Sequence, residues 1–218
     1  NITGVSAGFY VSWKAGYFWL GSLFLVVSGL LYFYSASYKR QFLIGNLVVA
    51  ILTSMVPFLV VCFEWPALYR YYTINAVSLP DLKLIFYWVG GFAFYAFMTT
   101  FIREIIKDIE DFEGDQAYGR NTLPVMVGIK TSKIIAASFT LITAILLYLT
   151  WYYLINDLIT LIYISVFITL PLVAVLYLLA IRSNPKQLHS ASSLMKVVML
   201  TGIAYSFVVK IILNNNLF

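Results

Sequence analysis

The sequence predicts an all-α, polytopic bundle of transmembrane helices. Of the 218 residues, 62% are hydrophobic and only 11% are charged, which excludes an ordinary soluble globular domain. Apolar runs of about 20 residues recur along the chain, and a helix of that length crosses a hydrocarbon core of roughly 30 Å. Composition and run length together indicate a protein whose helices cross the membrane several times.

Six complete spans are expected, at residues 17–37, 41–63, 83–103, 133–154, 158–181 and 194–213. Residues 1–13 are too few for another span, and we interpret them as the outgoing end of a seventh helix that begins before this sequence. The connection at 64–82 is rich in aromatic residues, which favours an interfacial belt or a short re-entrant segment.

The distribution of Lys and Arg predicts the orientation. If the spans alternate, the connections at 38–41, 103–133 and 182–196 share one side of the membrane and carry ten basic residues, against four on the other side. Basic connections stay in the cytoplasm and are attracted to anionic lipid. We therefore expect a multi-pass protein of the cell (inner) membrane with these connections facing the cytoplasm. Nucleic-acid binding is not expected, because the basic residues are dispersed and no recognised motif accompanies them.

The single cysteine and the single histidine carry little functional signal. Cys62 lies in an apolar span, where packing is the expected role, and it has no second cysteine for an internal disulfide. His189 follows Pro185 in a connection without a cysteine or second histidine nearby, which favours a surface histidine over a zinc ligand.

An acidic run, R-E-I-I-K-D-I-E-D-F-E-G-D at residues 103–115, follows the third predicted span. At 100° per residue, four of its carboxylates fall within about 60° of one another on a helix face, while Glu110 and Glu113 point away. The four are Glu104, Asp108, Asp111 and Asp115. Carboxylates at this spacing repel one another, and a helix C-terminus disfavours anions, so the face needs a cation. Oxygen ligands favour Mg²⁺ or Ca²⁺. The alternative is a solvated acidic loop.

Basic and amide side chains on the same membrane side complement these carboxylates. Lys39 and Arg40 end one span in the segment Y-S-A-S-Y-K-R-Q-F-L-I-G-N, and they are either topology anchors or phosphate ligands. Asn46 lies about one turn inside the next span, where its amide needs a hydrogen-bond partner. Arg120 follows the acidic run and is suited either to pairing with an aspartate or to clamping a phosphate.

These segments carry a resemblance to a known family. The run R-E-I-I-K-D-I-E-D-F-E-G-D-Q-A-Y-G-R-N-T-L-P-V-M-V-G resembles the second aspartate-rich motif of the UbiA superfamily of intramembrane prenyltransferases. The basic segment around Lys39 is similar to the connection and helix that the family places upstream. The form R-E-x-x-K-D-x-x-D-x-x-G-D looks most like the digeranylgeranylglyceryl phosphate synthase branch, which attaches a geranylgeranyl group to an ether-linked glycerol phosphate.

The resemblance also implies which part of a family member this chain corresponds to. Family members have nine transmembrane helices and a first aspartate-rich motif of the N-D-x-x-D type, which does not occur in this sequence. Residues 1–218 would then be the C-terminal two-thirds of a single membrane domain, and the six complete spans would be helices four to nine. The chain as given is expected to be inactive without the N-terminal part, because half of the metal site is missing.

The implied activity is Mg²⁺-dependent transfer of a polyprenyl group, geranylgeranyl in the resembling branch, from its diphosphate to a membrane-associated acceptor such as geranylgeranylglyceryl phosphate. The catalytic and metal-binding residues would be Asp108, Asp111 and Asp115. The contacts to the diphosphate would be Lys39, Arg40, Asn46, Lys107 and Arg120. The expected partners are therefore a polyprenyl diphosphate, a lipid-soluble acceptor and membrane lipids.

Two alternatives stay open. The first is a UbiA-type enzyme that acts on an aromatic acceptor of a quinone or haem pathway, since the donor site would be the same. The second is a membrane transporter, which would be expected to place charges at the bilayer midplane instead of gathering its acids at one face.

Overall fold

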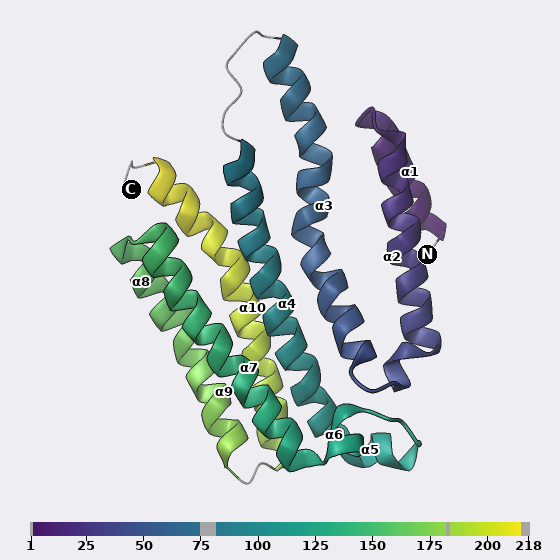
Figure 1. The fold of residues 1–218 in the computed structure, drawn as a ribbon, viewed down its shortest axis with the longest axis vertical. Coiled ribbons are helices and arrows are strands. Elements are labelled where there is room, and N and C mark those ends of the chain that lie inside the picture. The colour runs from purple at the N-terminus through teal and green to yellow at the C-terminus, as the bar shows by residue number, and fades with distance from the viewer. Residues whose placement is uncertain (1, 75–81, 182–183, 215–218) are drawn as a thin grey trace.

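The computed structural model describes residues 2–74, 82–181 and 184–214, which fold into helices with no strand among them. The long helices stand side by side with roughly parallel axes (Figure 1). Within the described residues, six helices are long and apolar enough to cross a membrane. The predicted fold class, an all-α polytopic bundle, is thereby confirmed, and the chain is an integral membrane protein.

The elements follow one another in hairpins. The first group comprises α1 (Ile2–Lys14), the short η1 (Phe18–Leu20), α2 (Gly21–Ala36), the short η2 (Tyr38–Arg40) and α3 (Ile44–Ile74). The second comprises α4 (Leu82–Glu110) and the short helices α5 (Phe112–Ala117) and α6 (Leu123–Val127). The third comprises α7 (Ile129–Thr150), the π-helical η3 (Trp151–Ile155), α8 (Leu158–Tyr163), the π-helical η4 (Ile164–Thr169), α9 (Leu170–Ala180) and α10 (Pro185–Asn214).

Three helices extend further than the hydropathy of the sequence predicts. Helix α3 continues to Ile74 through two internal prolines, so residues 64–74 complete a helix and form no re-entrant segment, while 75–81 lie outside the described residues. Helix α4 continues past the predicted end of its span at 103, and α10 begins before 194, with Pro185 at its first position. Hydropathy falls where charged residues begin, but charged residues do not end a helix, and proline is well tolerated at a first helical position.

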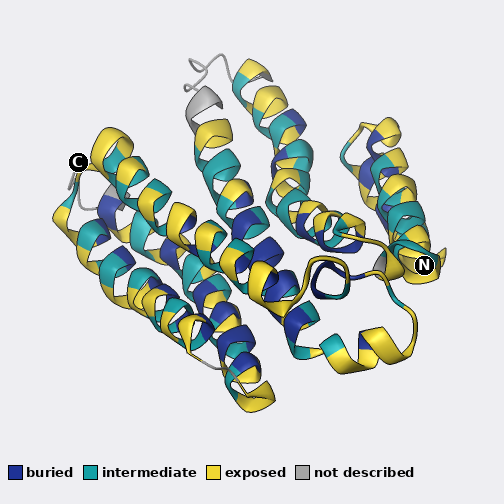
Figure 2. Cartoon of the chain, turned by 60° about the horizontal axis from the view of Figure 1, so that its bottom comes forward, coloured by how far each residue is buried: buried dark blue, intermediate teal, exposed yellow. Residues whose placement is uncertain are grey.

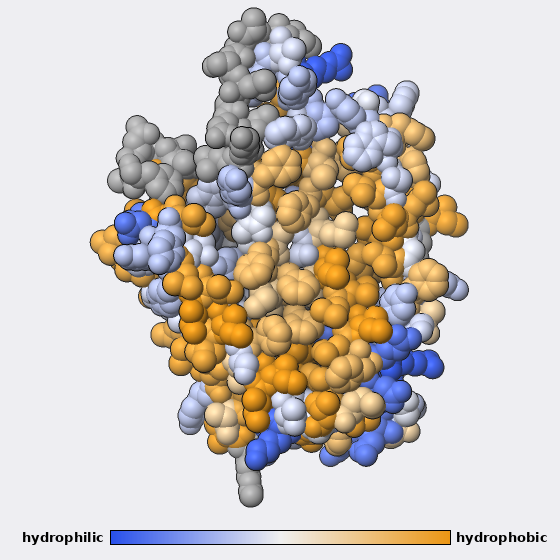
Figure 3. All heavy atoms as spheres, viewed as in Figure 1, coloured by the Kyte–Doolittle hydropathy of each residue, from blue (hydrophilic) through white to orange (hydrophobic). Residues whose placement is uncertain are grey.

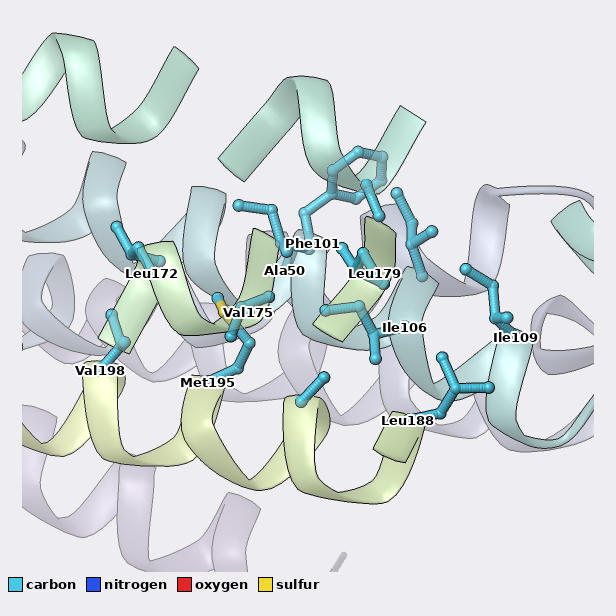
Figure 4. Close-up of a cluster of buried hydrophobic side chains, with 14 of the residues drawn as sticks. Ala50, Phe101, Ile106, Ile109, Leu172, Val175, Leu179, Leu188, Met195 and Val198 are labelled. Carbon is cyan, nitrogen blue, oxygen red and sulfur yellow. The ribbon is translucent and has the colours of Figure 1, made fainter. Parts of the chain in front are cut away.

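Helix α4 is the centre of the packed core. Its isoleucines at 102, 105, 106 and 109 recur at three- and four-residue intervals, so they share one face, and all are buried. They pack with side chains of α9 and α10, and Figure 4 shows Ile106 in the same cluster as Leu179 of α9 and Leu188 of α10. The predicted carboxylate face of α4 lies on its other side, at about 140° from the isoleucines. One helix therefore fills the core with one face and presents acids with another.

The outward faces of the bundle are apolar. Figure 2 shows exposed residues along the outer sides of the long helices and buried residues in inward stripes. On α10, for example, Leu200, Ile203 and Phe207 lie at helical spacing and are each more than two-thirds exposed. Figure 3 shows hydrophobic side chains across the middle of the molecule, with strongly hydrophilic ones gathered mostly at its lower end and others at its upper end and left side. Such an exposed apolar belt is what a lipid environment requires.

The N-terminal hairpin is held together by close contacts between glycine and phenylalanine. A Cβ atom at Gly8 would lie 2.3 Å from the Phe24 ring, and one at Gly21 would lie 2.3 Å from the Phe9 ring. Small residues of this kind let helix backbones approach closely in a membrane, where van der Waals packing drives association. Helix α2 therefore packs mainly on α1, whereas α3 packs mainly on α4, and direct contact between α2 and α3 is sparse.

Candidate functional site

A polar hollow lies at the end of the bundle where the connection between α2 and α3 meets the end of α4. Figure 1 shows this end at the bottom, together with α5 and α6. The hollow is lined by Tyr34 of α2, Gly45 and Asn46 of α3, Glu104, Lys107 and Asp108 of α4, and, in the following segment, Asp111, Asp115, Arg120 and Thr122. The four carboxylates predicted to share one helix face thus line the same hollow.

The backbone explains why these carboxylates stay together although α4 ends before the last of them. The Asp111 N–H donates to the Lys107 carbonyl oxygen at 2.9 Å, and the Asp115 N–H donates to the Asp111 carbonyl oxygen at 2.9 Å. These bonds have the spacing of an α-helix, so the helical face continues across the break between α4 and α5. The two remaining acids of the run leave that face, as predicted.

Glu110 and His189 form a contact away from the polar hollow. The Nδ1 atom of His189 on α10 lies 2.9 Å from Oε1 of Glu110 at the end of α4, and the histidine side chain is 68% exposed. His189 is therefore a surface residue that ties α10 to α4, in keeping with the prediction from the sequence. Glu113 is exposed to solvent.

Asn46 finds its hydrogen-bond partner in one of the carboxylates. Its side-chain Nδ2 donates to Oδ2 of Asp108 at 2.8 Å, which joins α3 to α4 across 62 residues of sequence. Asn46 is only 8% exposed, and an amide buried in a membrane-spanning helix without a partner would be costly. The bond fixes the orientation of the Asp108 carboxylate. The contact between Asn46 and a diphosphate stays a prediction.

Arg120 pairs with Asp115. Its Nη1 lies 2.9 Å from Oδ1 of Asp115, and its backbone N–H donates to the Asp115 carbonyl oxygen, also at 2.9 Å. The Asp115 side chain is buried while that of Arg120 is one-third exposed, so the guanidinium reaches from solvent to the buried acid. Of the two roles that the sequence left open for Arg120, pairing with an aspartate is the one seen in the structure.

The other predicted cations occupy different positions. Lys107 lines the polar hollow and is exposed. Arg40 lies close by through its backbone, because its carbonyl oxygen accepts the Asn121 N–H at 3.0 Å, but its side chain does not line the hollow. The side chain of Lys39 lies outside the described part of the chain. The segment after α5 is thus fastened to the connection between α2 and α3.

Sequence reasoning missed Tyr34, Gly45 and Thr122 as lining residues. Thr122 precedes Leu-Pro at the start of α6, a pattern typical of a helix N-cap, yet its hydroxyl makes no capping bond and is buried without a hydrogen-bond partner. Tyr34 carries the clearest missed signal, since it lies on the last turn of a span beside the basic pair. Helix α7 also begins earlier than the predicted start of its span at 133. It starts at Ile129, directly after Gly128, whose φ is +84°.

The carboxylate oxygens of the polar hollow suit a hard cation that is coordinated partly by the protein and partly by a phosphate group. Among the described residues, no group of three or more His, Cys, Asp and Glu side chains could hold a metal ion. Mg²⁺ commonly takes only one or two carboxylates and completes its octahedron with waters and substrate phosphates. One or two carboxylates from Asp108, Asp111 and Asp115 would suit that mode of binding, which needs no preformed group of three protein ligands.

Comparison with known proteins agrees with this geometry. The model of the UbiA prenyltransferase family matches residues 2–200, which include every residue that lines the polar hollow. The chain belongs to the UbiA prenyltransferase family. Its membership confirms the resemblance that the acidic run carries.

Relatives within the UbiA family include several named digeranylgeranylglyceryl phosphate synthase. That of Methanosphaera stadtmanae is 31% identical over 182 residues, covering 83% of this chain and 59% of the relative. That of Pyrococcus horikoshii is 36% identical over 142 residues, covering 65% and 43%. That of Methanobrevibacter smithii is 38% identical over 136 residues, covering 62% and 42%. The chain thus spans about half the length of these curated relatives. No solved structure matches significantly.

Proposed function

We propose that the protein is an intramembrane prenyltransferase that transfers a geranylgeranyl group from its diphosphate to geranylgeranylglyceryl phosphate. The relatives' name specifies the product, digeranylgeranylglyceryl phosphate, and this transfer would form it. One observation carries the proposal: the carboxylates of α4 and α5 line a hollow together with Lys107 and Arg120, at the end of an apolar bundle of the UbiA family. Such a site can take a charged diphosphate while the apolar tail stays in the membrane.

The residues of the hollow divide the work of binding. Asp108, Asp111 and Asp115 would hold Mg²⁺, which when bound neutralises charge that develops on the diphosphate as its bond to carbon breaks. The Asn46 amide holds Asp108 in one orientation, which prepares that carboxylate before substrate arrives. Lys107 and Arg120 supply ammonium and guanidinium donors for phosphate oxygens.

The reaction itself is a substitution at the first carbon of the prenyl chain. The C–O bond to the diphosphate breaks with its electron pair leaving on oxygen, and the acceptor hydroxyl oxygen forms the new bond to carbon and loses its proton. The developing allylic cation must be shielded from water. The apolar outer faces, such as that of α10, place the bundle in lipid, and an interior within the membrane would supply that shield.

The proposed function is tested by assaying the full-length protein in membranes. Incubation with labelled geranylgeranyl diphosphate and geranylgeranylglyceryl phosphate is expected to give a doubly prenylated ether lipid, and excess EDTA should stop the reaction until Mg²⁺ is restored. A parallel incubation with a hydroxylated aromatic acceptor tests the other branch. Transfer to the aromatic acceptor alone would reject the proposed acceptor, and no consumption of the diphosphate would reject the prenyltransferase.

The polar hollow should face the cytoplasm, since the connections on its side carry ten of the fourteen basic residues. Cysteine labelling with a membrane-impermeant reagent tests this orientation in intact cells. Ser190 is exposed near the start of α10, and Asn156 is exposed in the turn between η3 and α8. Figure 1 shows the start of α10 at the same end as α5 and α6, and α8 toward the opposite end. The variant Asn156→Cys should be labelled from outside, and Ser190→Cys only after permeabilisation. The reverse pattern would refute the orientation.

A further inference from the structure

Glu104 is the carboxylate of the polar hollow that lies furthest from the end of the bundle. It shares the acidic face of α4 with Asp108 but comes one turn earlier, which places it about 6 Å further along the helix toward the middle of the span. Figure 1 shows that α4 runs toward the end where α5 and α6 lie, so the later carboxylates lie closer to that end. Glu104 is therefore set apart from the three carboxylates that are candidates for holding Mg²⁺.

The side chain of Glu104 is secluded and held in place. It is only 12% exposed, and its Oε1 atom pairs with Nη1 of the neighbouring Arg103, whose side chain is 22% exposed. A carboxylate offers about four acceptor positions on its two oxygens, and the contact with Arg103 uses one of these oxygens. Glu104 therefore keeps the capacity to accept a hydrogen bond from a molecule in the hollow.

The polar face of α4 continues one turn beyond Glu104. Thr100 lies within about 40° of Glu104 around the helix. It is 2% exposed, and its hydroxyl is buried without a hydrogen-bond partner among the described residues. The hydroxyl of the adjacent Thr99, by contrast, donates to the Tyr95 carbonyl oxygen at 2.7 Å, as most buried hydroxyls do. Polar atoms on this face thus extend past the carboxylates toward the apolar interior.

The position of Glu104 matches that of the reacting atoms in the proposed transfer. The reacting carbon joins the diphosphate to the apolar tail, so it would lie on the membrane side of phosphates held near Asp111 and Asp115. The acceptor hydroxyl must come next to that carbon, and it must lose its proton as the new bond forms. Glu104 is the carboxylate of the hollow on that side.

We propose that Glu104 is the general base of the transfer, and that the acceptor is an alcohol whose hydroxyl approaches the reacting carbon beside this carboxylate. The C–O bond to the diphosphate breaks with its electron pair on the diphosphate oxygen. The acceptor oxygen forms the new bond to carbon, and its proton moves to a carboxylate oxygen of Glu104, from which it later passes to water. Arg103 acts as a positioning residue that holds the carboxylate. The inference rests on the proposed function, because it takes the hollow to hold a prenyl diphosphate.

Glu104→Gln in the full-length protein tests this role, with Glu113→Gln as its matched control. The amide keeps the shape of the side chain but does not act as a base. With geranylgeranylglyceryl phosphate as acceptor, kcat should fall at least about a hundredfold, which is the usual contribution of a general base. Glu113 is exposed and does not line the hollow, so Glu113→Gln should leave kcat within about twofold. A kcat unchanged in Glu104→Gln would refute the proposal and leave the proton to the diphosphate or to water.

An acceptor that needs no base separates proton transfer from a merely structural role. In this analogue a thiol replaces the reacting hydroxyl, and the assay is run at about pH 9, where a thiol with a pKa near 8.5 is mostly ionised. The loss caused by Glu104→Gln should then shrink to less than about tenfold, because the thiolate is already a nucleophile. Equal losses with the hydroxyl and thiol acceptors would make Glu104 a structural residue and overturn the proposal.

Equilibrium binding measures the donor site without turnover. Geranylgeranyl thiodiphosphate, whose C–S bond resists cleavage, should bind Glu104→Gln in the presence of Mg²⁺ with a Kd close to that of the unmodified protein. Asp111→Ala should bind it weakly. Weak binding by Glu104→Gln as well would assign this carboxylate to the metal or the diphosphate and refute its role as the base. Failure of the proposed function would look different, because the unmodified full-length protein would itself transfer no prenyl group to the alcohol.

Discussion

Replacing Asp111 or Asp115 with alanine in the full-length protein is expected to lower kcat of prenyl transfer at least about a hundredfold, which corresponds to about 2.7 kcal/mol of transition-state free energy. Both carboxylates line the polar hollow, where a Mg²⁺ ion and the diphosphate would need them. Asp111 gives the cleaner test because it is exposed, whereas Asp115 is buried and paired with Arg120. Asp115→Asn, which keeps the shape of the side chain, complements the alanine variant.

Glu113→Ala is the matched control for this prediction. Glu113 belongs to the same acidic run and is exposed, but it does not line the hollow, so its loss should leave kcat within about twofold. Rates are measured over a range of Mg²⁺ concentrations, together with the thermal unfolding of each variant in detergent. If Glu113→Ala costs as much as Asp111→Ala, the carboxylates act through their general charge, and the assignment of a functional helix face is wrong.

The acidic face could be predicted from the sequence because it depends only on local helix geometry. Glu104, Asp108, Asp111 and Asp115 are separated by three or four residues, and the helical hydrogen bonds continue through the break at Asp111. The fold class was predictable for a similar reason, since the length and apolarity of a membrane span are properties of a continuous stretch of chain.

Contacts between distant segments were beyond such local reasoning. The sequence indicated that Asn46 needs a partner, but only the packing of α3 against α4 identifies it as Asp108, 62 residues away. Tyr34 and Thr122 line the hollow because three separate segments converge there, which no periodicity encodes. The ends of α3 and α4 were misplaced because hydropathy reports where a chain can cross lipid and not where its backbone hydrogen bonds end.

An apolar groove between α2 and α3, with Leu31 and Val49 among its lining residues, shows a further limit of the sequence. Leu31 and Val49 look like ordinary residues of a membrane span, and their spacing is that of any lipid-facing or core-facing stripe. They line an open space only because α2 is held by α1 and α3 by α4. The width of the space between α2 and α3 depends on side chains of four helices, α1 to α4, and the sequence does not state which helices are neighbours.

Arg120→Ala is expected to raise KM for the prenyl diphosphate about tenfold, or to lower kcat to a similar extent if the contact tightens in the transition state. The guanidinium lines the hollow beside Asp115, so it is placed to contact a phosphate oxygen while it holds that carboxylate. KM for the acceptor should change little. Arg120→Lys should restore only part of the activity, because an ammonium does not reproduce the planar fork of a guanidinium.

Lys130→Ala is the control for the loss of a positive charge, because Lys130 is an exposed residue at the start of α7 that does not line the hollow.

A double-mutant cycle between Arg120→Ala and Asp115→Asn separates two modes of action of Arg120. If Arg120 acts only by orienting Asp115, its removal should have no further effect in the Asp115→Asn background. Additive losses would indicate a separate contact with the diphosphate. A selective rise in the acceptor KM would instead assign Arg120 to the acceptor's phosphate, and kinetics unchanged from those of Lys130→Ala would leave it the role of a cytoplasmic topology anchor.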